Sequence, residues 1–202
     1  MNVTFDSSEP IVDALRVKDL LAGLSDKRGK IARLIQTGEL VPLRRGLYAT
    51  TRDLHPFCLA ASIYGPSYIS YETALSYHGL IPEAVFEVTS ATLKRPRRFE
   101  NAYGRFCYHR IPREAYAIGI EQVTESGIPF LIASATKALC DRIALESRIR
   151  SMVDVRRWLT LMRLDEIFEI DQTVLANCAL HYGSPAVRQL HRTVETHGGI
   201  AT

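Results

Sequence analysis

The chain has 202 residues, enough for two small domains rather than one compact one. Hydrophobic residues make up 47% of it and charged residues 23%, which excludes a largely disordered or a collagen-like protein. The formal net charge of +3 is too small by itself to indicate a nucleic-acid-binding protein.

The positive charge is concentrated in two segments. Residues 1–50 carry a net charge of +2 and residues 94–113 carry +6, whereas residues 51–93 carry −3 and residues 114–202 carry −2. This uneven distribution indicates an anionic partner, although solvated surfaces also produce such runs of charge.

Several classes of protein lack support in the sequence. No run approaches 18 apolar residues, and the N-terminus has no basic segment followed by an apolar one, so we expect neither a membrane span nor a secretory signal. The four cysteines lie far apart, which predicts free thiols in a cytoplasmic protein and no metal site. Phosphate-loop, dinucleotide-binding and serine-hydrolase motifs are absent, so we expect no cofactor, no catalytic residue and no enzymatic activity.

Two short helices are predicted near the N-terminus. Apolar residues recur at helical spacing over residues 15–24, and again between Ser25, the expected N-cap, and Gly38. The second helix carries four cations beside its apolar stripe, namely Lys27, Arg28, Lys30 and Arg33. This pattern is typical of the recognition helix of a helix-turn-helix, although the solvated face of a small helical bundle has the same appearance.

A basic hairpin is predicted directly after these helices. The pattern becomes extended over residues 39–49, and Arg44-Arg45-Gly46 stands at the expected turn. Helix, turn, basic helix and basic hairpin together predict a winged helix-turn-helix in an N-terminal domain over residues 1–80. We expect the helix cations to enter the major groove of double-stranded DNA, and Arg44 and Arg45 to reach phosphates or the adjacent minor groove.

Helices are also predicted over residues 55–63 and 70–77, and a strand over residues 85–89. His78 follows the second of these helices. Because no nucleophile or second carboxylate lies nearby in the sequence, we interpret His78 as a structural residue at the helix end rather than as an acid–base group.

A basic strip with interleaved aromatic residues follows over residues 94–113. Its candidate secondary basic patch consists of Lys94, Arg95, Arg97, Arg98 and Arg105. Such a strip is typical of surfaces that follow a phosphate backbone and stack on unpaired bases, and equally of a solvated hairpin whose arginines protect an edge strand. If the strip lies on the same side as the basic hairpin, it would extend the DNA interface. If the strip faces away from the hairpin, an acidic or RNA-binding partner would fit it better.

The C-terminal half is predicted to be a small antiparallel sheet packed with three or four helices. A hairpin is expected over residues 118–132, and amphipathic helices begin at four N-capping residues, Ser134, Ser151, Asp171 and Ser184. Asp154 completes a capping box with Ser151, and Trp158 and Cys178 are interpreted as core residues. The whole chain is therefore predicted to be α+β, with a C-terminal domain over residues 81–202.

Three blocks of sequence resemble the AbiEi-type antitoxins of type IV toxin–antitoxin systems and their transcription-regulator relatives. The run ARLIQTGELVPLRRGLYAT resembles the end of their winged-helix domain, and PSYISYETALSYHGLIPE (residues 66–83) resembles the segment that joins their two domains. The third block is TSATLKRPRRF, followed at a distance by ASATKALCDRI. The resemblance touches most of residues 17–146.

The resemblance implies a sequence-specific DNA-binding autorepressor that binds inverted repeats in its own promoter. It also implies an antitoxin of an abortive-infection system, whose C-terminal domain counters a co-encoded nucleotidyltransferase toxin without forming a stable complex with it. The residues of the chain themselves support only the DNA-binding half of this description.

Two other functions stay open at this point. A winged-helix regulator with a ligand-sensing or dimerising C-terminal domain and no toxin partner would have the same N-terminal features, and a neighbouring gene for a nucleotidyltransferase would separate the two cases. Some relatives with this N-terminal domain carry a nuclease domain, whose metal site needs an Asp and a Glu-x-Lys. The run Glu87-Val88-Thr89 lacks the lysine, which disfavours a nuclease.

Overall fold

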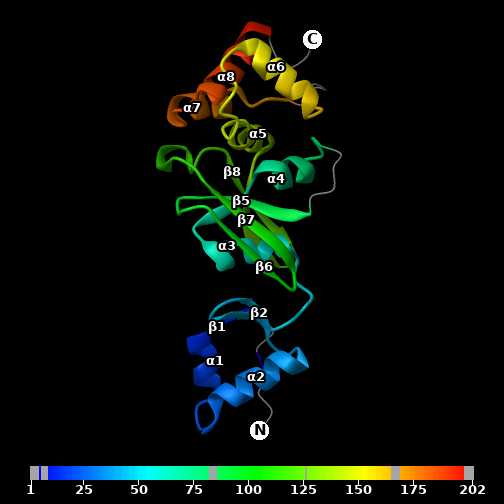
Figure 1. The fold of residues 1–202 in the computed structure, drawn as a ribbon, viewed down its shortest axis with the longest axis vertical. Coiled ribbons are helices and arrows are strands. Elements are labelled where there is room, and N and C mark those ends of the chain that lie inside the picture. The colour runs from blue at the N-terminus through cyan, green and yellow to red at the C-terminus, as the bar shows by residue number, and fades with distance from the viewer. Residues whose placement is uncertain (1–4, 6–8, 82–85, 126, 165–168, 198–202) are drawn as a thin grey trace.

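The computed structural model describes residues 5, 9–81, 86–125, 127–164 and 169–197. The molecule is elongated: a small N-terminal unit stands at one end, a larger sheet lies in the middle, and a group of helices forms the other end (Figure 1). The described residues form eight α-helices and two β-sheets, which confirms the expected α+β class.

The N-terminal unit combines two helices with a three-stranded antiparallel sheet in the order β1-β3-β2. Its elements are β1 (Ile11–Asp13), α1 (Ala14–Leu20), α2 (Lys27–Thr37), β2 (Val41–Arg44) and β3 (Leu47–Ala49). The strand β1 is an addition to the elements expected from the sequence. A small separate core holds the unit together and consists of Val12, Val17, Leu21, Leu34 and Leu40.

Local chemistry explains where α2 begins and ends. The Asp26 carboxylate accepts a hydrogen bond from the Gly29 amide at 2.8 Å, so the N-cap is Asp26 and the expectation of Ser25 is wrong. The charge of an aspartate also complements the positive end of the helix dipole, which a serine does not do. At the other end Gly38 has φ +79°, a left-handed conformation that glycine adopts at low steric cost.

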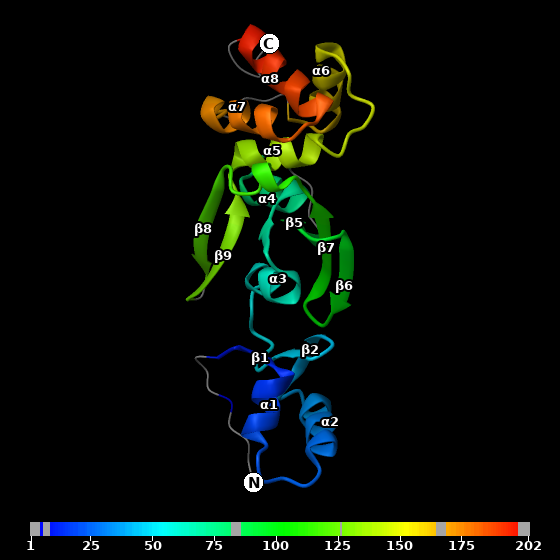
Figure 2. The same ribbon diagram turned by 90° about the vertical axis from the view of Figure 1, so that its left-hand side faces the viewer.

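The larger sheet has six strands in the order β6-β7-β5-β4-β9-β8, with β8 and β9 on one side and β6 and β7 on the other (Figure 2). Its strands are β4 (Ser67–Ile69), β5 (Glu87–Thr92), β6 (Arg97–Asn101), β7 (Gly104–Arg110), β8 (Ile120–Glu125) and β9 (Ile128–Ala133). The expected hairpin of residues 118–132 is present as β8 and β9. Ser126 of this hairpin lies outside the described residues. So does Val85, the first residue of the strand expected over residues 85–89.

The larger sheet is mixed, so the expectation of an antiparallel sheet is wrong. β5 pairs with β7 in parallel over its whole length, and β4 pairs with β9 in parallel. The physical reason is β4, which has three residues that are all buried and therefore lacks the polar–apolar alternation that marks a strand in sequence. The sequence therefore predicts neither β4 nor its parallel pairing with β9. β5 pairs in parallel with β7 for a separate reason, because β7 and not the preceding strand β6 lies beside it.

Helices surround the larger sheet and form the C-terminal end of the molecule. α3 packs against β4, β9 and β5, α4 packs against β5 and α5, and α8 contacts both α6 and α7 (Figures 1 and 2). Their bounds are α3 (Pro56–Tyr64), α4 (Tyr71–Tyr77), α5 (Ala135–Ile143), α6 (Met152–Leu161), α7 (Gln172–His181) and α8 (Pro185–His197), with a short 3-10 helix η1 (Arg113–Ala115). A division of the chain at residue 80 would therefore separate α3, β4 and α4 from the strands that they pack against.

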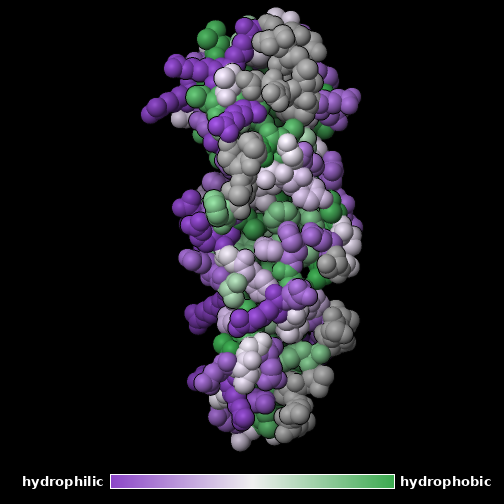
Figure 3. Space-filling view, turned by 90° about the vertical axis from the view of Figure 1, so that its right-hand side faces the viewer, coloured by the Kyte–Doolittle hydropathy of each residue, from purple (hydrophilic) through white to green (hydrophobic). Residues whose placement is uncertain are grey.

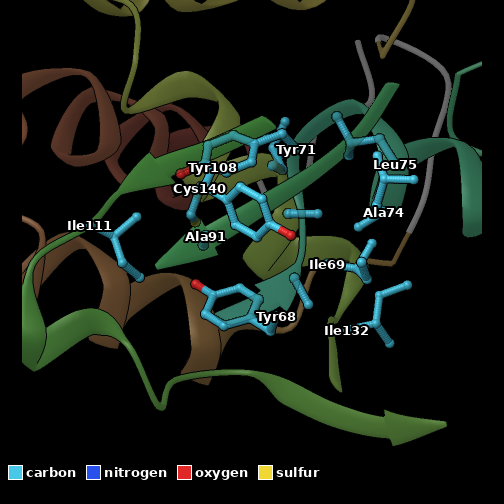
Figure 4. Packing of buried hydrophobic residues seen from close by; sticks show 14 of the residues in the cluster. Tyr68, Ile69, Tyr71, Ala74, Leu75, Ala91, Tyr108, Ile111, Ile132 and Cys140 are labelled. Carbon is cyan, nitrogen blue, oxygen red and sulfur yellow. The ribbon is translucent and has the colours of Figure 1, made fainter. Parts of the chain in front are cut away.

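Neighbouring residues of β7 show how α3 and α4 cover opposite faces of the sheet. The Tyr108 side chain is buried in the core, and its hydroxyl donates a hydrogen bond to the Ala60 carbonyl of α3 at 2.7 Å (Figure 4). The ring of His109 instead packs against Tyr71 of α4, with ring centroids 4.8 Å apart. Because successive strand residues point to opposite faces, the two helices lie on opposite sides.

Several local predictions for single residues are confirmed. Ser151 and Asp154 form a capping box at the start of α6. His78 is the C-cap of α4, and its Nε2 lies 2.8 Å from the Ala133 carbonyl oxygen, so the residue has a structural contact. Trp158 and Cys178 are buried, as expected for core residues.

A fully buried ion pair joins α5 to the elements around it. Lys137 Nζ lies 2.9 Å from Asp141 Oδ1, and neither side chain is exposed to solvent. The Asp141 carboxylate also accepts hydrogen bonds from three hydroxyls, those of Tyr68, Ser70 and Tyr182. Lys137 in turn donates to the Ala115 carbonyl of η1 at 2.8 Å. Each charge thus has several partners, without which a buried ion pair is strongly destabilising.

Replacing Lys137 by Met removes the buried cation while keeping most of the side-chain volume. We expect Lys137→Met to lower the free energy of unfolding by about 3–5 kcal/mol, because Asp141 then keeps a buried charge without its counter-ion. The double variant Lys137→Met/Asp141→Leu should recover part of this loss. Urea unfolding measures both, with the exposed Lys18→Met as the control. A single variant as stable as this control would contradict the prediction.

Candidate nucleic-acid interface

Three of the four expected DNA-binding cations of α2 spread around the outer part of the helix, whereas Lys27, seven residues before the buried Leu34, lies on the inner side. Arg28 and Arg33 are exposed, whereas Lys27 and Lys30 are half-buried. At 3.6 residues per turn, Arg28 and Lys30 lie on opposite flanks, with Arg33 between them on the side away from the buried Leu34. α2 therefore presents a broad cationic surface rather than a single row of cations.

The strands β2 and β3 form the expected basic hairpin, which covers residues 41–49. Gly46 at its turn has φ +77°, and its carbonyl accepts a hydrogen bond from the Ala14 amide at 2.9 Å, which holds the turn against the start of α1. Leu43 is buried, while Arg44 and Arg45 are exposed. The hairpin is therefore anchored by its apolar side chains and presents both arginines to solvent.

The basic hairpin is attached to the larger sheet by side-chain hydrogen bonds. Asn101, at the end of β6, donates through Nδ2 to the Leu43 carbonyl at 3.1 Å. The Tyr103 hydroxyl, in the turn between β6 and β7, donates to the Thr51 carbonyl. The buried side chain of Leu43 also belongs to the same continuous core as the larger sheet. These contacts determine the position of the hairpin relative to β6.

A basic cleft of about 550 Å³ lies where the hairpin meets β6 and the C-terminal end of α3. We use this name for the space lined by four cations, Arg44, Arg45, Lys94 and Arg97, together with Tyr64, Phe99 and residues 61–63 and 65. No acidic residue is among these lining residues. The structure thus brings two predicted DNA-binding residues of the hairpin together with two residues of the predicted secondary basic patch.

Aromatic rings support the two cations that the larger sheet contributes to the basic cleft. Lys94 Nζ lies 5.1 Å from the ring centroid of Tyr64, and Arg97 Cζ lies 5.0 Å from that of Phe99. The two rings contact each other, with centroids 5.6 Å apart. Such cation–π contacts orient the charged groups without neutralising them. The sequence does not point to Tyr64, because the residue comes from a helix that is distant in the chain.

The other members of the predicted secondary patch are dispersed. Arg95 is exposed, and its carbonyl accepts a hydrogen bond from the Tyr64 hydroxyl. The Arg98 guanidinium contacts Cys107 Sγ at 3.4 Å, away from the basic cleft. Arg105 lines a different cleft, at the start of β7. Alternation along β6 and the turn before β7 separate these residues, so the strip is not one continuous patch.

Cys107 and His109 lie close together, but their surroundings oppose an activated thiol. The Cys107 Sγ lies 3.5 Å from the His109 Nε2. Burial raises the pKa of the Cys107 thiol, although Arg98 lowers it in part, and burial lowers the pKa of His109. The thiol is therefore protonated and the imidazole neutral near pH 7, which is the reverse of a catalytic Cys–His pair.

Hydrophilic side chains follow one long edge of the molecule. In Figure 2 the elements α2, β2 and β6 all lie along the right-hand edge. Figure 3 views the molecule from the opposite side, so this edge is on its left, where purple residues recur from the N-terminal unit upward. The basic cleft and α2 thus belong to the same side of the molecule.

No three His, Cys, Asp or Glu side chains among the described residues are grouped so that they could hold a metal ion. No helix in the described ranges is long and apolar enough to cross a membrane.

Comparison with known proteins adds no relative. No protein-family model matches the chain, and no curated protein matches its sequence.

Proposed function

We propose that the chain is a sequence-specific DNA-binding autorepressor and an antitoxin that counters a co-encoded nucleotidyltransferase toxin. In this proposal the N-terminal unit is a winged helix-turn-helix, α2 is its recognition helix and the basic hairpin is its wing. The observation that carries the DNA-binding part is the basic cleft, in which Arg44 and Arg45 of the hairpin share one acid-free space with Lys94 and Arg97.

The proposed docking places α2 in the major groove. Arg33 and Gln36, which are exposed on the side of α2 away from its apolar face of Ile31, Leu34 and Ile35, would face the edges of the bases. Arg44 and Arg45 would then contact the phosphates that border the groove. Lys94 and Arg97 would contact phosphates further along the same DNA strand, because they line the same cleft as the hairpin arginines. The anionic ligand that fits this row is the backbone of a duplex.

The antitoxin part of the proposal rests on the sequence blocks that resemble AbiEi-type antitoxins. The resemblance assigns neutralisation of the toxin to the C-terminal domain and implies that no stable complex with the toxin is needed. A fragment that begins at residue 81 would lack β4, the strand between β5 and β9. A test of this part therefore needs the full chain.

Neutralising the cations of α2 tests its role as a recognition helix. The variant Lys27→Gln/Arg28→Gln/Lys30→Gln/Arg33→Gln should lose retention of a promoter fragment in a gel shift, because it removes four charges from the surface expected in the groove. The control has the same charge change at four exposed arginines elsewhere, Arg113, Arg148, Arg150 and Arg188. Equal retention by the α2 variant and the unaltered protein would exclude this assignment.

The salt dependence of binding tests whether the basic cleft lies on DNA. Arg44→Ala/Arg45→Ala and, separately, Lys94→Ala/Arg97→Ala should each weaken binding to all sequences, and should reduce the slope of log K against log salt by up to about 0.9 for each lost phosphate contact. The slope is measured by fluorescence anisotropy over a range of salt concentrations. If only the hairpin pair changes the slope, DNA does not extend onto the larger sheet.

Co-expression with the toxin separates the two halves of the proposed function. The full chain should restore growth of cells that produce the nucleotidyltransferase encoded beside it. The α2 variant should restore growth equally well while failing to repress a promoter reporter, because the antitoxin activity is assigned to residues 81–202. Continued growth arrest in the presence of the folded full chain would refute the antitoxin part and leave the DNA-binding part standing.

A further inference from the structure

A second cleft, distinct from the basic cleft, is lined by aromatic rings from distant parts of the chain. It has a volume of about 380 Å³, and five rings line it, those of His55, Phe57, Tyr77, Phe86 and Tyr103. They come from the start of α3, the end of α4, the residue before β5 and the turn between β6 and β7. We call this space the aromatic cleft. None of these rings lines the basic cleft at the other end of α3.

Contacts within the protein fix the orientation of most of these rings. The ring of His55 meets the ring of Phe57 edge to face, with centroids 4.5 Å apart, and Phe57 contacts Tyr77 at 6.3 Å. The Tyr103 hydroxyl is held by the Thr51 carbonyl. A flat ligand would therefore meet preorganised ring surfaces and would lose little affinity to ordering of the protein.

Phe86 is the exception and indicates that a ligand completes the cleft. It is 81% exposed, although phenylalanine is among the residue types most often buried. Among the described residues it stacks on no other ring. Tyr77, which lines the same cleft, is also exposed, and several exposed rings gathered at one cleft are typical of a binding site.

Two charged side chains at the same cleft define what the ligand must carry. Glu87 and Arg105 both line it, and they are neighbours across the parallel strands β5 and β7. The Arg105 side chain is exposed and suits an anion, while the Glu87 carboxylate is a hydrogen-bond acceptor. The Glu87 carboxylate forms a long ion pair with Arg98 at 3.9 Å and a hydrogen bond with the Cys107 thiol, and its two oxygens can accept further hydrogen bonds. The ligand therefore combines a flat face, hydrogen-bond donors and a negative charge.

We propose that the aromatic cleft binds a nucleotide, with its base on the aromatic rings, the donors of the base toward Glu87 and its phosphate on Arg105. Base–aromatic stacking is a strong and general mode of nucleotide recognition. A quaternary ammonium would use the rings and the charge of Glu87 but would leave Arg105 without an anion, and an aliphatic side chain would use neither charge. Guanine is the preferred base, since it presents two adjacent N–H donors to one carboxylate, and uracil is the least suited.

This inference goes beyond DNA binding by α2 and the basic cleft and does not depend on it. A free mononucleotide and an unpaired nucleotide within a single strand offer the same base and phosphate. A nucleotide in the aromatic cleft would also give the part of the chain around the larger sheet the ligand-sensing property of a regulator without a toxin partner, the alternative function that the sequence leaves open. The proposed function and this site can therefore succeed or fail separately.

Titration of the full-length protein with mononucleotides tests the site. Isothermal calorimetry should give the order GMP, then CMP and AMP, then UMP, and Phe86→Ala should weaken GMP binding by about 5-fold to about 150-fold, the loss of one base–aromatic stack. Arg105→Gln should weaken GMP but leave guanosine unchanged, and Glu87→Gln should reduce the preference for GMP over UMP. The control is Leu180→Ala, an exposed apolar residue on α7.

The source of the nucleotide is resolved by competition. If short single-stranded oligonucleotides containing one guanine displace GMP and bind more tightly, the ligand is an unpaired base in a strand. If they do not, the ligand is a free nucleotide. Both results support the site.

Three results would overturn the proposal. The first is the absence of saturable binding by any mononucleotide or guanine-containing strand. The second is binding that Phe86→Ala and Arg105→Gln leave unchanged. The third is binding that Arg44→Ala/Arg45→Ala abolishes instead, which would assign the phosphate to the basic cleft. Thermal unfolding confirms that each variant is folded, and Arg105→Gln alone still decides the question if Phe86→Ala is not.

Discussion

The buried carboxylate of Asp141 is the interaction on which the larger half of the molecule depends. Its partners come from β4, the N-cap of α4, α5 and the C-cap of α7, so one charged group joins the middle of the sheet to the helical end. Because a buried anion is tolerated only when it is fully compensated, these elements must adopt their native positions together. From β4 the strands β5, β7 and β6 follow in this order toward one edge of the sheet. That edge strand, β6, carries Arg97.

The second constraint is the attachment of the basic hairpin to that edge. Val41, Leu43, Leu47 and Ala49 of the hairpin belong to the core of the larger sheet, whereas the helices α1 and α2 pack on a small core of their own. The hairpin is therefore shared between the two parts of the chain. Charges on the hairpin and on β6 consequently have one fixed geometry, and a flexible linker would not provide it. A rigid shared element of this kind is what a ligand contacting both parts requires.

How much of the fold and of the candidate site can be predicted depends on whether residues close together in the sequence carry the signal. The hairpin at Arg44-Arg45-Gly46 and the capping box at Ser151 follow from residues a few positions apart, and both are present. The strand β4 has no alternation, so neither it nor its parallel pairing with β9 can be predicted from the sequence, and the parallel pairing of β5 with β7 depends on long-range packing. Arg44 and Arg97 line one cleft, and Phe57 and Phe86 line another. Both placements depend on packing between distant segments, which no local sequence pattern encodes. Lys137 and Asp141 did have a local signal, opposite charges one helical turn apart within an apolar run.

The length of α3 has a consequence for the two clefts at its ends. α3 has nine residues and is therefore about 14 Å long, with the aromatic cleft at its first residues and the basic cleft at its last. Electrostatic screening in water acts over about 8 Å at physiological ionic strength and over about 30 Å at 0.01 M. Anions held at both ends are nearly independent in the first case and repel each other in the second. One short helix thus sets the spacing of the two proposed anion sites, and two unit charges at that spacing in water repel by only about 0.3 kcal/mol even without screening.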